Sequence, residues 1–193
     1  MKNAILIHGL QDKNEYYDPK TPAPGTDHWF SWLKKQLLTR DIYAETPTIY
    51  KTFTASYEQF VQTVERSLKI DQDTILVGHS FGGGFLVRYL SENKNIKVGK
   101  VVLVAPWLNP DKDPALETTD FFDFDIDPNL VSRTDGVTIF SSDNDAESIK
   151  QSVQKISGAA HNIKVVDFHN YGHFCYEDMK THEFPELLEE TLS

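Results

Sequence analysis

Short apolar runs alternate with longer amphipathic segments along the chain, and this alternation constrains the fold more than any other feature of the sequence. Runs such as Ile75 to Val77 and Val101 to Val104 contain no polar residue, as expected for strands that are buried on both faces. Strands that alternate with helices predict a parallel sheet covered by helices, which is an α/β fold. The six predicted strands are approximately Asn3 to His8, Ile42 to Thr46, Thr74 to Gly78, Lys100 to Val104, Val137 to Ser141 and Ile163 to Asp167.

Helical periodicity marks the segments between these runs. Phe60, Val64 and Leu68, for example, recur at helical spacing and predict a helix face that packs on the sheet. Six strands and five helices nearly account for 193 residues, so we expect one domain over residues 1–193, without a large cap domain. The predicted helices cover approximately Asp27 to Leu38, Ser56 to Leu68, Gly83 to Glu92, Ala146 to Ser157 and Cys175 to Leu192.

Two stretches interrupt the alternation and are predicted as long loops. Leu10 to Thr26 is polar and contains three prolines, and Asn109 to Asp135 holds seven acidic residues between Asp111 and Asp127. The second loop is either a solvated excursion or a lid over a site at the carboxyl edge of the sheet. As a lid, its acidic residues would disfavour anionic substrates.

The charge and cysteine content exclude several classes of protein. Nineteen Lys and Arg against 29 Asp and Glu give a net charge of −10, which argues against a partner made of nucleic acid and against binding to anionic lipid. The longest apolar run, Val101 to Leu108, falls short of the roughly 18 residues that span a bilayer, and the first ten residues lack a signal-peptide core. A single cysteine, Cys175, excludes an internal disulfide. We therefore expect a cytoplasmic protein.

The motif Gly78-His79-Ser80-Phe81-Gly82 follows the third predicted strand directly and precedes a predicted helix. A Gly-x-Ser-x-Gly sequence between a strand and a helix is typical of a nucleophile elbow, in which the serine occupies a sharp, strained turn. Glycine at both ends of the motif allows strand, turn and helix to cross closely. Ser80 is therefore the candidate nucleophile.

A serine nucleophile needs a base, and the base needs a carboxylate to orient it. His173 follows the last predicted strand and Asp145 follows the fifth, so both are expected at the same edge of the sheet as Ser80. Asp143 is the alternative acid. The order serine, acid, histidine is that of α/β-hydrolases.

The oxyanion of such a reaction needs two backbone N–H donors. The residue after the nucleophile, Phe81, would supply one, and Leu10 or else Gly9, in the loop after the first strand, would supply the other. We also expect His8, Gly9 and, at the ends of later strands, Trp107 and Phe174 to border the substrate pocket.

Neither a metal nor a cofactor is predicted. His169 and His173 have a spacing that suits a metal site only on a helix, and Gly172 between them predicts a loop. Cys175 could pair with His173 as a nucleophile, but it lacks an elbow, so a buried structural thiol is expected.

Taken together, these motifs resemble the small serine hydrolases related to retinoblastoma-binding protein 9, including the YdeN type. The resemblance covers nearly the whole chain in the same order. It is carried by His8-Gly9, the segment His28 to Leu33, Gly78-His79-Ser80, Ser142-x-Asn144-Asp145 and Gly172-His173-Phe174.

The resemblance implies a minimal α/β-hydrolase fold with strand order 2-1-3-4-5-6, helices on both faces, and the triad Ser80, Asp145 and His173. It favours Asp145 over Asp143, because the acid of the family is the aspartate that usually precedes a proline. Ala146 stands at that proline position in this chain.

The sequence thus predicts a cofactor-independent serine hydrolase that cleaves a small, neutral or moderately apolar carboxylic ester through an acyl-enzyme. A thioesterase, an amidase or a peptidase could use the same triad. A hydrolase fold that serves mainly to bind a protein partner, as the family name invites, is the alternative from another class.

Overall fold

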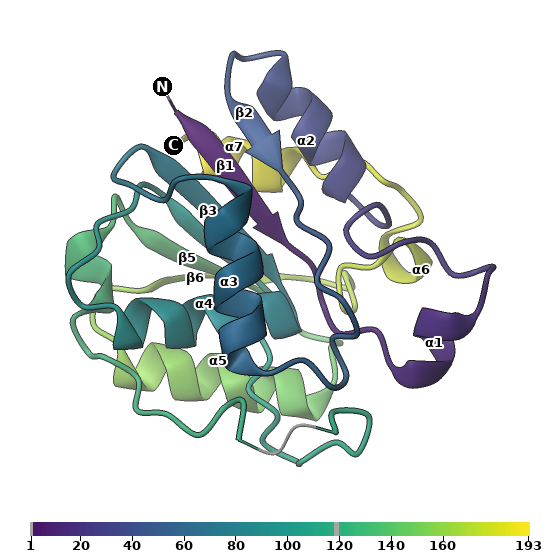
Figure 1. Ribbon diagram of the computed structural model, residues 1–193. Helices are drawn as coiled ribbons and strands as arrows, with labels where there is room; N and C mark the ends of the chain where they lie inside the picture. The colour runs from purple at the N-terminus through teal and green to yellow at the C-terminus, as the bar shows by residue number, and fades with distance from the viewer. Residues whose placement is uncertain (1, 118–119) are drawn as a thin grey trace.

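The computed structural model describes residues 2–117 and 120–193, and a six-stranded parallel sheet forms its centre (Figure 1). The strand order is β2-β1-β3-β4-β5-β6, as predicted. The strands are β1 (Asn3–Ile7), β2 (Tyr43–Glu45), β3 (Thr74–His79), β4 (Val101–Val104), β5 (Val137–Ser142) and β6 (Lys164–Phe168). Every predicted strand is present, with ends that differ from the prediction by no more than one residue.

Burial explains why these strands were recognisable. All residues of β3, β4 and β5 are buried, since helices cover both faces of a parallel sheet. The edge strand β6 is different, because its residues are exposed or half-buried.

Helices lie on both faces of the sheet. Figure 1 shows α3, α4 and α5 in front of it and α7 behind it, and α2 packs against α7 and β1. The helices are α1 (Lys13–Tyr17), α2 (Phe30–Leu38), α3 (Tyr57–Ser67), α4 (Phe81–Glu92), α5 (Glu147–Ala159), α6 (Tyr176–Met179) and α7 (Pro185–Leu192), with a 3₁₀ turn η1 (Leu130–Arg133). Within residues 2–117 and 120–193, no helix combines the length and apolar character needed to cross a bilayer.

Two predictions about helices were wrong. The helix predicted from Cys175 to Leu192 is interrupted, because Lys180 adopts a left-handed conformation (φ 58°) after α6 and Pro185 begins α7. The loop predicted from residue 10 to 26 contains α1, whose start is fixed by a capping box between Asp12 and Glu15. Five residues are too few for periodicity to reveal a helix.

The carboxyl ends of β1, β3, β5 and β6 meet at one edge of the sheet, since all neighbouring strands run parallel. Ligand sites of open α/β sheets lie at this edge. The loops that follow these four strands therefore contain the residues of interest.

Candidate active site

Ser80 lies in the sharp turn between β3 and α4. Its backbone has φ 52° and ψ −118°, a strained conformation for a residue other than glycine. Three hydrogen bonds hold it there: its N–H donates to the Val104 carbonyl at 2.9 Å, and its carbonyl accepts from the N–H groups of Gly84 and Trp107, each at 3.0 Å. The turn has the geometry of a nucleophile elbow, with the half-buried Ser80 side chain at its apex.

Two glycines permit this turn. A Cβ on Gly78 would lie 2.7 Å from the Gly82 carbonyl oxygen, and one on Gly82 would lie 2.6 Å from the carbonyl oxygen of His8. Both separations are too short for any side chain. The start of α4 therefore packs directly on the end of β1, as the spacing of the motif predicts.

His173 lies in the loop after β6 and contacts Asp145, which follows β5. Its Nδ1 lies 3.0 and 3.1 Å from the two carboxylate oxygens of Asp145, whose side chain is only 3% exposed. Such a buried carboxylate orients the imidazole and stabilises its protonated form. Asp143, the alternative acid, instead contacts the ring of His169 and accepts from the N–H of Asn170.

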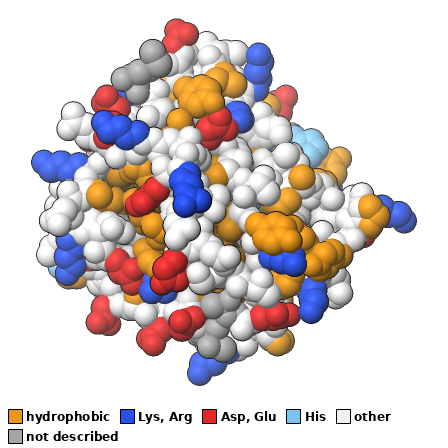
Figure 2. Space-filling view, viewed as in Figure 1, with side chains coloured by type: hydrophobic (Ala, Val, Ile, Leu, Met, Phe, Trp, Pro, Cys, Tyr) orange, Lys and Arg blue, Asp and Glu red, His pale blue; other side chains and the backbone are white. Residues whose placement is uncertain are grey.

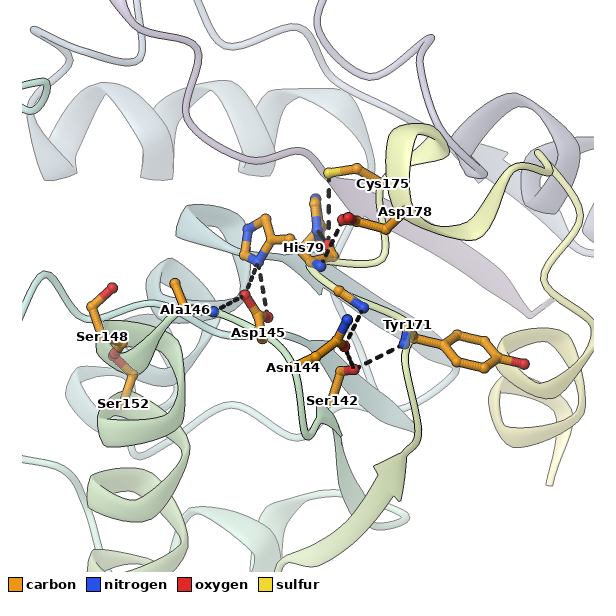
Figure 3. Close-up of polar contacts among 12 residues, drawn as sticks. His79, Ser142, Asn144, Asp145, Ala146, Ser148, Ser152, Tyr171, Cys175 and Asp178 are labelled. Atoms are coloured by element: carbon orange, nitrogen blue, oxygen red, sulfur yellow. Dashed lines mark hydrogen bonds and ion pairs between the residues drawn. The ribbon is translucent and has the colours of Figure 1, made fainter.

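The loop that carries His173 is fastened to the turn after β5 (Figure 3). The N–H of Tyr171 donates to Ser142 Oγ at 3.0 Å, and the N–H of Gly172 donates to Asn144 Oδ1 at 2.8 Å. Ser142 Oγ itself donates to Asn144 Oδ1 at 2.8 Å. These bonds fix the distance between the segment with the acid and the segment with the histidine.

Two further side chains hold the backbone of His173. Its N–H donates to Asp178 Oδ2 and its carbonyl accepts from His79 Nε2, both at 2.8 Å. Burial, and then the neighbouring His173, hold the pKa of His79 well below its usual value. His79 is therefore neutral, with its proton on Nε2, and it braces His173 without carrying charge.

His8 fixes the loop that follows β1. The N–H of Ile49 donates to His8 Nε2 at 3.0 Å, so the proton of this neutral ring is on Nδ1, which donates to the Gly9 carbonyl at 2.8 Å. Burial lowers the pKa of His8 to about 4. The Gly9 carbonyl and the Leu10 N–H belong to one trans peptide and point in opposite directions. His8 thereby sets the direction of the Leu10 N–H.

The two candidate oxyanion donors flank the elbow. Phe81 is the first residue of α4, where backbone N–H groups have no acceptor within the helix. The loop with Leu10 packs against the elbow, since a Cβ on Gly9 would lie 3.3 Å from Ser80 Cβ. Both N–H groups thus belong to segments in contact with Ser80.

A cavity of about 510 Å³ opens beside Ser80 and His173. His8 and Gly9 line it, and half of its lining residues come from residues 10–25. Among the described residues no hydrogen bond joins Ser80 Oγ to His173, a common state of catalytic pairs without substrate. The cavity gives a carbonyl group access to both side chains.

Trp107 and Phe174 do not line this cavity, contrary to expectation. Trp107 is 6% exposed and packs against Phe81 and Phe122, with ring centroids 6.2 and 6.0 Å apart. Phe174 is fully buried and stacks on Phe184 at 5.6 Å. Both rings are therefore part of the core. Trp107 packs against the elbow, and Phe174 packs beneath the loop that carries His173.

Residues 109–135 do not form a lid over this cavity, as far as they are described. Thr118 and Thr119 lie outside the described residues, and none of the others lines the cavity. The rings of Phe121 and Phe81 are 4.4 Å apart, and Arg88 donates to the Phe121 carbonyl. The segment packs on α4, and its described acidic residues are not among the charged residues that line the cavity. The acidic residues that line it are instead Glu15, Asp18, Asp27 and Glu177.

Cys175 also lines the cavity, but burial raises the pKa of its thiol to about 12. The thiol is therefore protonated at neutral pH, which argues against a cysteine nucleophile. Its Sγ donates to the His173 carbonyl at 3.6 Å.

The residues that hold the His173 loop differ in how well the sequence indicated them. Ser142 and Asn144 stand in the turn with the acid, and His79 stands beside the nucleophile, so each had a positional signal. Asp178 had none, because its contact with His173 depends on the bend before α6.

The chain is similar to known hydrolases over most of its length. A family model described as Serine hydrolase matches residues 19–189. A relative in Bacillus subtilis (strain 168), named "Putative hydrolase YdeN", is 25% identical over 185 residues, which cover 92% of this chain and 88% of the relative.

Solved structures support the same fold. The ydeN gene product of B. subtilis superposes with a TM-score of 0.72 at 22% identity, over 98% of this chain and 96% of the other. The carboxylesterase CesB (YbfK) of B. subtilis gives a TM-score of 0.62 at 13% identity, over 100% of this chain and 82% of the other. The predicted resemblance to YdeN-type hydrolases is confirmed, whereas the relation to retinoblastoma-binding protein 9 stays a prediction.

Proposed function

The chain belongs to the serine hydrolase family, and from that premise we propose that Ser80, His173 and Asp145 form a triad that hydrolyses small, neutral or moderately apolar carboxylic esters. One observation carries the proposal: the buried Asp145 carboxylate contacts His173 at 3.0 Å, and His173 shares a cavity with a serine in a strained elbow. This combination has a chemical use and no evident structural one.

The first half of the reaction acylates the enzyme. His173 takes the proton from Ser80 Oγ while the oxygen attacks the ester carbonyl carbon, and Asp145 stabilises the imidazolium. The N–H groups of Phe81 and Leu10 hold the negative oxygen of the tetrahedral intermediate. The intermediate collapses, the bond to the alkoxy oxygen breaks, and His173 returns the proton to the leaving alcohol.

The second half releases the acid. Water enters the cavity, gives a proton to His173 and attacks the acyl carbon. The second tetrahedral intermediate uses the same two N–H groups, and its collapse returns the proton to Ser80 Oγ. Besides the ester and water, the proposed cycle uses only side chains and backbone amides of this chain.

The character of the cavity supports a small, uncharged substrate. Its volume, about 510 Å³, suits a compact ester. Four carboxylates against one lysine, Lys20, line it, so a negatively charged acyl or alcohol group would be repelled. A neutral ester meets no such penalty.

Two acid variants test the proposal. Asp145→Asn should lower kcat for p-nitrophenyl butyrate by about 10⁴-fold, because the amide leaves His173 in the wrong tautomer. Asp143→Asn is the matched control and should keep kcat near the wild-type value. Equal losses in both variants would contradict the assignment of the acid.

A further inference from the structure

Three side chains that the proposed mechanism does not use come together on the wall of the catalytic cavity. A ring nitrogen of His28, Sγ of Cys175 and a carboxylate oxygen of Glu177 all lie within 4.8 Å of one another. The three residues line the cavity together with Ser80 and His173. Imidazole, thiolate and carboxylate are the ligand types that Zn²⁺ takes in proteins.

We propose that His28, Cys175 and Glu177 bind a Zn²⁺ ion and that the bound ion inhibits the hydrolase. The inhibition rests on the function proposed above, whereas the metal site does not. A water molecule would complete the tetrahedron that Zn²⁺ prefers. Binding forms a sulfur–zinc bond at Cys175 and releases the thiol proton to solvent.

The donor atoms are near the separations that such a site needs. Zinc–ligand bonds of about 2.0 to 2.3 Å place the ligands of a tetrahedral site roughly 3.3 to 3.6 Å apart. His28 Nδ1 and Glu177 Oε2 are 4.0 Å apart, and the Glu177 side chain is 72% exposed. The exposed Glu177 side chain has room to rotate, and such a rotation can shorten its separation from His28 Nδ1.

Hydrogen bonds connect His28 to the segment that carries the other two donors. His28 is in a left-handed conformation (φ 53°), and its carbonyl accepts from His182 Nδ1 at 2.6 Å. Its own Nδ1 accepts from the N–H of Tyr176 at 3.2 Å, a long bond that coordination at this nitrogen would replace. His28 is thus tied to the segment that carries Cys175 and Glu177, although the two lie about 150 positions apart in the sequence.

The charge of the cavity wall favours a cation at this place. Asp27 Oδ1 lies 3.7 Å from His28 Nδ1, and Asp18 and Glu15 line the same cavity. Lys20 is the single Lys or Arg among the described lining residues. A divalent ion that approaches this wall therefore meets an attractive field.

A bound ion would obstruct catalysis in two ways. It would occupy part of the cavity, and it would make the charge beside His173 more positive by one unit once the thiol has lost its proton, which disfavours the imidazolium that His173 must form. Cys175 also contacts the His173 carbonyl through its S–H group (Figure 3), and that contact is lost when the thiolate binds metal. Turnover should therefore fall as the site fills.

The metal site can be tested without activity. Ser80→Ala protein is titrated with CoCl₂, and the expected result is the near-ultraviolet absorption band of a cobalt-bound thiolate. The band should disappear with a further Cys175→Ser change. A further His28→Ala or Glu177→Gln change should weaken Co²⁺ binding at least about tenfold, since even partners of metal ligands contribute 10- to 100-fold.

His161→Ala and Glu183→Gln serve as matched controls, because both residues are exposed and neither lines the cavity. These changes should leave the band unaltered. Thermal melts without metal identify any variant that does not fold, and the conservative Cys175→Ser and Glu177→Gln proteins then carry the test. No thiolate band, or a band insensitive to both His28→Ala and Glu177→Gln, would overturn the metal site.

The inhibition is tested with ZnCl₂ on otherwise wild-type protein. Zn²⁺ should inhibit ester hydrolysis, a chelator should restore it, and Cys175→Ser should require at least about ten times more Zn²⁺ for the same inhibition. Equal sensitivity of wild type and Cys175→Ser would show that Zn²⁺ acts on the triad itself and would overturn the inhibitory role. A cobalt band together with a wild-type protein that lacks esterase activity would contradict the proposed function and leave the metal site standing.

Discussion

Two long irregular segments leave the carboxyl edge of the same sheet, on either side of the elbow strand, and they end in different places. Residues 10–26 follow β1 and supply half of the residues that line the cavity. Residues 109–135 follow β4 and, where described, pack on α4 without reaching the cavity. Figure 2 shows acidic side chains along the lower edge of the molecule, where this second segment runs in Figure 1.

The difference follows from what each segment can bury. Leu116, Phe121 and Leu130 of the second segment are at most 5% exposed, and Arg133 pairs with Asp127 at 2.7 Å to close its end. Between residues 11 and 26 no side chain is buried. A segment with several large apolar side chains packs on the core even when it also holds acidic residues, whereas a segment without them remains at the edge and can surround a site.

Of the changes that compare the two segments, the largest effect should come from His8, just before the start of the first segment. His8→Ala removes the ring that orients the Gly9–Leu10 peptide, so kcat for a neutral ester should fall by about 10² to 10³-fold, as when one oxyanion donor is lost. KM should change much less, because the donor acts mainly in the transition state. Steady-state kinetics on protein with a native circular dichroism spectrum checks this. An unchanged kcat would remove the Leu10 N–H from the oxyanion site.

The second segment should respond in the opposite manner. Leu130→Ala deletes a buried side chain and should lower the free energy of unfolding by about 3 kcal/mol. At a temperature where the variant is folded, kcat/KM should stay within about twofold of wild type, since Leu130 does not line the cavity. Urea unfolding and kinetics on the same preparation measure both. A large loss of kcat/KM would mean that residues 109–135 take part in the site after all.

As the pH falls, the stability that His8 contributes should be lost before the stability that Asp127 contributes. The folded-state pKa of His8 is about 4 against 6.5 in the unfolded chain, so the unfolded state binds more protons between these values and stability falls as pH falls. This contributes about 2 kcal/mol of lost stability between pH 7 and pH 5. In residues 109–135, hydrogen bonds from the Asn129 N–H and Arg133 outweigh burial and keep the pKa of Asp127 below its usual value, so this group begins to lose stability only at lower pH.

Urea unfolding at pH 7 and pH 5 distinguishes the two groups. His8→Asn should reduce the loss between these pH values, while Asp127→Asn should leave it as in wild type. The same loss in wild type and His8→Asn would contradict the neutral, buried state of His8.

The smallest effect concerns charge. The wall carboxylates should make p-nitrophenyl hemisuccinate a poorer substrate than p-nitrophenyl butyrate, and the double change Asp18→Asn with Asp27→Asn should narrow the ratio of kcat/KM values about two- to fivefold at low salt. Asp123→Asn with Asp125→Asn removes the same charge from exposed positions in residues 109–135 and should leave the ratio unaltered. An equal response to both double changes would mean that net charge, not the wall, sets the preference.

The strands could be predicted from the sequence to within one residue at each end, and the central ones were the clearest because strands buried on both faces are mostly apolar. The ends of helices were less certain. The interruption between α6 and α7 depends on Lys180 in a left-handed turn, and α1 depends on the Asp12 capping box. Local side-chain bonds of this kind leave little trace in hydrophobic periodicity.

The candidate catalytic residues had strong signals in the sequence, whereas the part of the cavity wall that comes from residues 10–25 had none. An elbow motif and the order of the strands nominate Ser80, His173 and an acid that is either Asp145 or Asp143, and the family resemblance favours Asp145. Both long loops were expected at the same edge of the sheet, however. No feature of the local sequence indicated which of the two would pack on α4. That choice depends on Phe121, whose ring packs between those of Phe60 and Phe81 at 4.9 and 4.4 Å.

The activated state of Ser80 is the central claim, and a fluorophosphonate probe tests it most directly. Wild-type protein should gain the mass of one adduct, and peptide mapping should locate that adduct on Ser80. The Ser80→Ala protein should gain none under the same conditions. A wild-type protein that stays unmodified, or an adduct on Cys175, would contradict the account.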